Sequence, residues 1–167
     1  MANPGANQRG LLDIGTFVVP RIVIENTIQF LQEVGSEGYE GFVLWGGQAH
    51  PEGSLRFTSV IIPEQHGMMT EKGLLVFVDG EALFKVNKTL YERNEILAGQ
   101  VHTHPTSAYH SSTDDHYPLV TLLGAMSVVI PDFARNAPND LQSWAWYRLG
   151  SRRRWELLTK KTRVVFE

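Results

Sequence analysis

Two histidines stand at the end of an apolar segment that runs from Ile96 to His104, and Pro105 follows them directly. The segment is typical of a strand, which Pro105 ends. Because side chains alternate between the two faces of a strand, His102 and His104 lie on the same face. Both imidazoles can therefore reach one metal ion.

A hydroxyl and a carboxylate follow the histidines at a short distance along the chain. Seven residues separate His104 from Ser112, and Asp115 comes three positions after Ser112, so a loop can bring both side chains back to the ion. Two histidines, one carboxylate and an open fourth position are typical of a catalytic zinc site and not of a closed structural one. The chain contains no cysteine, which excludes disulfides, thiolate ligands and a cysteine nucleophile.

The full spacing of HxH, seven residues and SxxD resembles the JAMM signature of the JAB/MPN zinc metalloprotease family. Residues 125–133 resemble the strand and turn that follow the metal loop in bacterial members, which are encoded with ubiquitin-activating-like and conjugating-like enzymes. The resemblance covers roughly residues 15–165. It implies an α+β fold, JAB/MPN-like (cytidine-deaminase-like), with a central mixed β-sheet flanked by helices. It also implies one zinc ion (Zn2+) per chain, held by His102, His104 and Asp115 with water as the fourth ligand.

The loop residues leave two alternatives open. Asp114 competes with Asp115 for the carboxylate ligand; the family spacing favours Asp115, which leaves Asp114 as a helix-capping or solvated residue. Ser112 fits an N-cap, with Asp115 three residues later, and it also fits a donor to the oxyanion that develops on an attacked carbonyl. One serine can serve both roles.

The water of such a site needs a carboxylate as general base, brought from elsewhere in the fold. In the family a glutamate near an early strand supplies it, in a pattern like ExxGxLxG. The segment from Glu40 to Gly47 fits this frame in part, with Val43 and Trp45 in place of the usual glycine and leucine. The resemblance therefore implies Glu40 as the base, with Glu37 as the rival.

The resemblance implies a zinc-dependent isopeptidase or peptidase, deubiquitinase-like, that cleaves after the C-terminal glycine of a ubiquitin-like protein, in deconjugation or in precursor processing. The expected partners are the tail of that protein, its conjugates, and activating-like and conjugating-like enzymes. Three alternatives are a peptidase that matures a sulfur-carrier protein, a non-catalytic MPN scaffold and a RadC-like protein. The intact ligand set argues against the scaffold, and the Ser112 spacing argues against the RadC-like protein.

Outside the motif, length and apolar patterns predict a flexible tail over residues 1–10 and a single domain over residues 11–167. A helix is expected from Pro20 to about Gly35, with Ile24, Ile28 and Leu31 on its buried face. A second helix is expected over about 80–94. Strands are expected at 16–19, at 42–45 with an end at Gly46-Gly47, and at 55–62, 74–78, 96–104, 125–130, 143–149, 155–158 and 163–166.

Charge and hydropathy limit which partners and which cellular location the sequence predicts. The formal net charge of -3 gives no general attraction to nucleic acid, and the run from Arg152 to Arg154 fits a solvated turn. No apolar run approaches the roughly 20 residues that span a bilayer, and the first residues lack the pattern of a signal peptide. We expect a cytoplasmic protein that contacts no membrane. His110 and His116 flank the metal loop; a contact with the substrate or with the metal ligands is one alternative, and a solvent-facing position is the favoured one.

Overall fold

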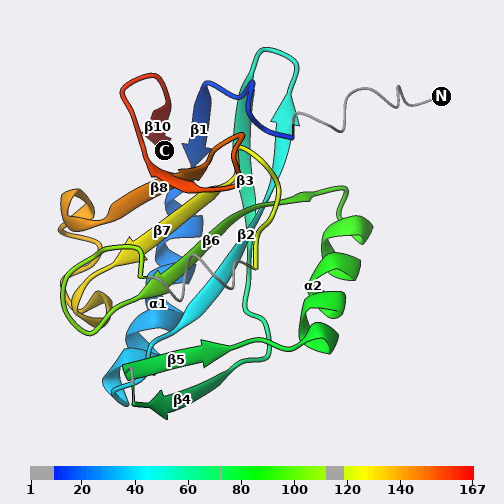
Figure 1. Ribbon diagram of the computed structural model, residues 1–167. Helices are drawn as coiled ribbons and strands as arrows, with labels where there is room; N and C mark the ends of the chain where they lie inside the picture. The colour runs from blue at the N-terminus through cyan, green and yellow to red at the C-terminus, as the bar shows by residue number, and fades with distance from the viewer. Residues whose placement is uncertain (1–9, 72, 112–118) are drawn as a thin grey trace.

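The computed structural model describes residues 10–71, 73–111 and 119–167. This part of the chain forms a mixed α+β fold with a curled sheet (Figure 1), as expected from the order of apolar patterns. The elements, in chain order, are β1 (Thr16–Val19), α1 (Arg21–Ser36), β2 (Phe42–His50), β3 (Ser54–Ile61), β4 (His66–Thr70), β5 (Gly73–Phe77), α2 (Gly80–Glu92), β6 (Ile96–Thr103), β7 (Met126–Ile130), β8 (Ala145–Leu149), β9 (Trp155–Leu157) and β10 (Arg163–Phe166).

The strands of the main sheet lie in the order β10-β1-β3-β2-β6-β7-β8-β9. Strand β6, which carries His102, is central: it pairs antiparallel with β2 and parallel with β7. The expected mixed sheet is therefore confirmed. Strands β4 and β5 form a separate antiparallel hairpin, at the lower end of the view in Figure 1.

Helix α1 covers one face of the sheet and lies behind the strands in Figure 1. Its predicted stripe of Ile24, Ile28 and Leu31 is buried in the core. Across this interface the indole N–H of Trp45 donates to Thr27 Oγ1 at 2.8 Å. Because side chains alternate along β2 and β6, the face that carries His102 is the one turned away from α1.

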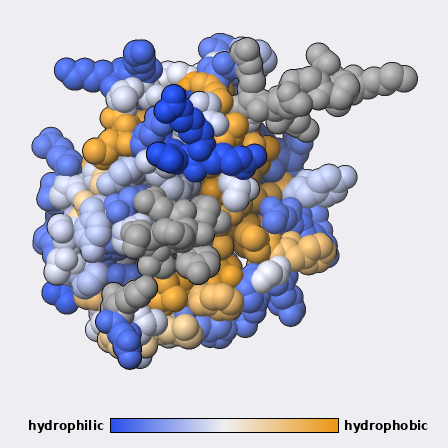
Figure 2. All heavy atoms as spheres, viewed as in Figure 1, coloured by the Kyte–Doolittle hydropathy of each residue, from blue (hydrophilic) through white to orange (hydrophobic). Residues whose placement is uncertain are grey.

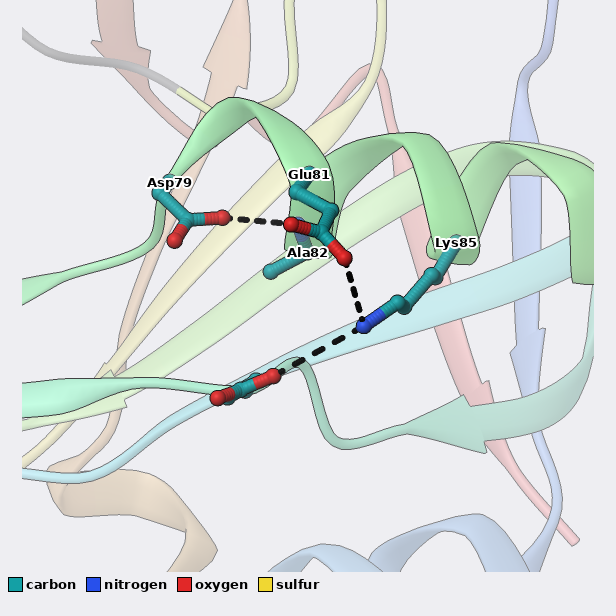
Figure 3. A network of polar contacts seen from close by, with 5 residues as sticks. Asp79, Glu81, Ala82 and Lys85 are labelled. Atoms are coloured by element: carbon teal, nitrogen blue, oxygen red, sulfur yellow. Dashed lines mark hydrogen bonds and ion pairs between the residues drawn. The ribbon is translucent and has the colours of Figure 1, made fainter.

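Helix α2 lies beside the sheet and begins with a side-chain cap (Figure 3). The Asp79 carboxylate accepts a hydrogen bond from the Ala82 amide at 2.8 Å, which satisfies one of the unpaired donors of the first turn. Lys85 forms ion pairs with Glu81 at 3.1 Å and with Glu64 at 3.9 Å. The Glu81 carboxylate raises the pKa of Lys85.

The predicted end of the second strand at Gly46-Gly47 is wrong, because β2 continues through both glycines to His50. The pairing register shifts at these residues, which form a bulge. A Cβ on Gly46 would lie 2.6 Å from Leu90 of α2, and one on Gly47 would lie 2.8 Å from the Arg56 carbonyl oxygen. The glycines therefore allow close packing inside a strand instead of ending it.

One further difference concerns strand β4. The sequence predicts no strand at β4, whose residues are all exposed and give no buried apolar pattern. The view of Figure 2 shows hydrophobic residues at the surface between hydrophilic ones on the rim. Among the described residues, no helix is long and apolar enough to cross a membrane.

Candidate metal centre

The imidazoles of His102 and His104 point to a common position at the end of β6. Their Nε2 atoms lie 3.2 Å apart, and both side chains are buried, with exposed fractions of 3% and 6%. Alternation along the strand accounts for this arrangement, as the sequence predicts. Two imidazole nitrogens that face one another in this way can share a bound cation.

The backbone of His104 is held by the last residue of β7 and by the turn that follows this strand. The His104 amide donates to the Ile130 carbonyl at 3.0 Å, and the Phe133 amide donates to the His104 carbonyl at 2.9 Å. Asp132, Phe133 and Ala134 have φ angles of 54°, 52° and 59°. Left-handed backbone at three successive residues other than glycine is strained, and such strain persists only where the surrounding structure imposes it.

Aromatic rings border the two histidines. The Phe42 ring stacks on His102 with centroids 5.8 Å apart and an interplanar angle of 8°. The Tyr109 ring meets His104 edge-on at 4.7 Å and is half exposed. These rings restrict the rotation of both imidazoles and leave Tyr109 at the solvent side of the pair.

Glu40 lies where the antiparallel register of β2 and β6 continues past Phe42 and His102. The Gly41 amide donates to Thr103 Oγ1 at 3.0 Å, and the Thr103 amide donates to the Gly41 carbonyl at 3.1 Å. Extending this register by one more residue would set Glu40 across from His104. Since alternate residues share a face, Glu40 belongs to the same face as Phe42 and both histidines.

The rival carboxylate, Glu37, has a different position. It is the C-cap residue of α1, its side chain is exposed, and Gly38 with a φ of 82° turns the chain away from the helix. Nothing in the pairing of β2 with β6 brings Glu37 to the histidines. The geometry therefore favours Glu40.

The remaining predicted site residues, Ser112 and Asp115 with its rival Asp114, lie outside the described residues, as does His116. Among the residues that are described, no group of three or more histidine, cysteine, aspartate or glutamate side chains could hold a metal ion. The structure thus brings together His102 and His104. The register of β2 and β6 assigns Glu40 to the same face of the sheet, while the loop ligands stay predictions.

The described donors fit zinc. Nitrogen ligands lie about 2.0–2.1 Å from a tetrahedral zinc ion, which separates two of them by about 3.3 Å. The Nε2 atoms of His102 and His104 are 3.2 Å apart, close to this separation. Two imidazoles, together with the carboxylate ligand expected from the loop, match the donor set of a catalytic zinc site.

Sequence reasoning missed a polar network behind the histidines. His110 is half-buried, with its Nε2 2.8 Å from Ser127 Oγ and its amide donating to the Tyr147 hydroxyl at 3.2 Å. The expectation that His110 faces solvent is therefore wrong. Ser127 lies in the apolar run of β7, where one buried serine among aliphatic residues was the only signal in the sequence.

Taken together, the fold and the histidine pair define an α+β protein with a candidate metal centre at the end of a central strand. Two solved structures share this fold. A protein from Desulfitobacterium hafniense, DSY2949, has a TM-score of 0.62 at 12% identity, with 90% of this chain and 92% of that chain covered. A protein from Salinibacter ruber has a TM-score of 0.58 at 15% identity, with 89% and 90% covered.

One curated relative shows the family. The chain is 38% identical to the probable metalloprotease y4jG of Sinorhizobium fredii over 145 residues. This match covers 87% of this chain and 88% of the relative. The chain belongs to the family of this probable metalloprotease. No family model matches the sequence.

Proposed function

We propose that this chain is a zinc-dependent peptidase of the JAMM type, within the JAB/MPN family, that cleaves after the C-terminal glycine of a ubiquitin-like protein. The observation that carries the proposal is the buried pair of Nε2 atoms 3.2 Å apart. The Gly41–Thr103 pairing supports it, because it extends the β2–β6 register toward Glu40. The metalloprotease name of the relative supports peptidase activity. Residues 11–167 would form one catalytic domain.

In this proposal His102, His104 and Asp115 hold the zinc ion. When bound, zinc supplies a Lewis acid that lowers the pKa of a water toward about 7 and polarises a carbonyl. Burial of the two histidines keeps their nitrogens in place and reduces competition from bulk water.

Glu40 acts as the general base and acid. Its carboxylate takes a proton from the attacking water and later delivers that proton to the leaving amine, so the group returns to its starting state. The Ser112 hydroxyl donates to the oxygen of the attacked carbonyl, where negative charge develops. The net reaction adds one water molecule across one amide bond.

A substrate with an extended, ubiquitin-like tail suits this site better than a substrate whose side chain must enter a deep pocket. Two surface depressions among the described residues lie away from the histidines, one between α1 and β3 and one beside β8 and β10. Selectivity would therefore come from a folded partner whose extended tail reaches the histidines.

The test uses a ubiquitin-like protein fused through its C-terminal glycine to a second protein, with an unrelated short peptide beside it. We expect the zinc-loaded chain to cleave the fusion and not the peptide, and a chelator to stop the reaction. Cleavage that resists the chelator would overturn the metal mechanism. Equal cleavage of both substrates would overturn recognition of the partner, and binding of the fusion without cleavage would favour a scaffold.

A further inference from the structure

Gln100 and Ser127 form a polar pair in the middle of the sheet. They are partners in the parallel register of β6 and β7, and both are buried, with exposed fractions of 2% and 0%. The Gln100 amide nitrogen, Nε2, donates to Ser127 Oγ at 3.1 Å. Polar groups at such a position destabilise the fold unless each finds a partner.

The partners of this pair come from the two chain segments that flank residues 112–118. On the preceding side, His110 Nε2 lies 2.8 Å from Ser127 Oγ. On the following side, the amide of Val120 donates to Gln100 Oε1 at 3.1 Å. One buried polar pair therefore fixes both ends of the segment in which Ser112 and Asp115 are expected.

The pair also lies next to the candidate metal centre. Gln100 precedes His102 by two residues on β6 and so shares its face, and the His110 ring meets the His102 ring at 6.1 Å between centroids. Strand β6 thus carries, on one face, the histidines and the group that holds the returning chain.

We propose that Gln100 and Ser127 are positioning residues for metal binding, acting through Val120 and His110. Fixing both ends of a loop reduces the conformational entropy that its side chains lose when they bind an ion, and so raises the affinity. The inference rests on the proposed function for the identity of the loop ligands. Its structural part, the attachment of Val120 and His110, stands on the described residues alone.

The test compares Gln100→Met and Ser127→Ala with the control Thr27→Val. The control also removes one buried hydroxyl, the acceptor of the Trp45 indole N–H, but on the α1 face of the sheet. Zinc affinity is measured by competition with a chelator, thermal unfolding of the metal-free protein gives stability, and hydrogen exchange of the metal-free protein reports on the Val120 amide.

We expect Gln100→Met and Ser127→Ala to weaken zinc binding by about 10–100-fold, the usual effect of losing a group that orients the ligands. Exchange of the Val120 amide should be about tenfold faster in Gln100→Met. Thr27→Val should lose thermal stability and keep wild-type zinc affinity. Ser127→Thr, which keeps the hydroxyl, should restore most of the affinity lost in Ser127→Ala.

Unchanged zinc affinity in Gln100→Met and Ser127→Ala, with a wild-type chain that binds zinc, would overturn the positioning role and leave the proposed function intact. Equal weakening in Thr27→Val would also overturn it, because general destabilisation would then explain the loss. A wild-type chain that binds no zinc would overturn both proposals. Faster exchange of the Val120 amide in Gln100→Met would then show only that the Val120–Gln100 hydrogen bond is structural.

Discussion

Gly41 and Thr103 pair in both directions: the Gly41 amide donates to Thr103 Oγ1 at 3.0 Å, and the Thr103 amide donates to the Gly41 carbonyl at 3.1 Å. This pairing extends the β2–β6 register beyond the last paired residues of the sheet. It connects the segment that carries Glu40 to the residue between the two histidines. The position of the proposed base is therefore tied to the position of the proposed metal ligands.

Glu40→Gln tests the base. The amide keeps the shape of the side chain but cannot take the proton of the attacking water, so kcat should fall by about 10²–10⁴-fold. Zinc content should stay at one ion per chain, because the change leaves the expected ligands intact. Cleavage kinetics on the fusion substrate and metal analysis of the same sample check both expectations.

Glu37→Gln is the matched control, with the same chemical change at the exposed end of α1. Its rate should stay close to that of the wild type. If Glu37→Gln loses activity while Glu40→Gln keeps it, then Glu37 is the base and the register argument is wrong.

Thr103→Val tests the pairing that positions Glu40. The substitution keeps the shape of a buried side chain but removes the acceptor of the Gly41 amide, so unfolding should cost about 1–3 kcal/mol less. We expect kcat to fall while zinc affinity, measured with a chelator, stays unchanged. A parallel loss of zinc affinity would show that Thr103 supports the histidines and not Glu40.

The sequence predicts those parts of the site and fold in which the repeat of a strand or a helix determines which side chains share a face. Alternation along β6 places His102 and His104 on one face, and the structure has them there. The helical spacing of Ile24, Ile28 and Leu31 likewise predicts the buried face of α1 correctly. Each of these predictions needs only neighbouring residues.

The rest depends on contacts between segments that are distant in sequence. Gly46 and Gly47 read locally as a strand end, but tight packing against Leu90 and Arg56 explains them. The burial of His110 depends on Ser127, seventeen positions away. Periodicity carries no information on such contacts, so the sequence predicts neither of them.

The double variant His102→Ala, His104→Ala tests metal binding. Both imidazoles are expected ligands, so the variant should lose the single zinc ion that we expect the wild type to hold, as measured by metal analysis after dialysis. His66→Ala is the control, since His66 is exposed on the separate β4–β5 hairpin. Unchanged zinc content in the double variant would exclude the proposed site.

Arg148→Met tests what fixes the first described segment to the sheet. The guanidinium donates to the carbonyls of Leu11 and Ile14 at 2.7 Å each and to Thr162 Oγ1 at 2.8 Å, and burial lowers its pKa. Removing these donors takes a hydrogen bond away from each of these acceptors, so the free energy of unfolding should fall by about 2–4 kcal/mol in urea denaturation. Arg152→Met, in the exposed β8–β9 turn, should change it little; an equal loss there would contradict the assignment.

The final prediction links α1 to the metal centre through Gly35. A Cβ at this position would lie 2.6 Å from Phe133 Cβ and 2.8 Å from the Phe133 carbonyl oxygen, so Gly35→Ala must displace Phe133. The Phe133 amide donates to the His104 carbonyl and its φ is 52°, so the displacement reaches a strained turn that holds a proposed ligand. We expect a loss of about 1–3 kcal/mol in stability by urea denaturation, although alanine favours a helix.

Zinc affinity should fall in the same variant, because His104 loses its fixed backbone partner. Gly80→Ala is the matched control: it lies in the first turn of α2, where an added Cβ meets no atom within 4 Å. Its stability should stay the same or rise by up to about 1 kcal/mol, with zinc affinity unchanged. If Gly35→Ala loses stability but binds zinc as tightly as the wild type, then the Phe133–His104 hydrogen bond does not support the metal centre.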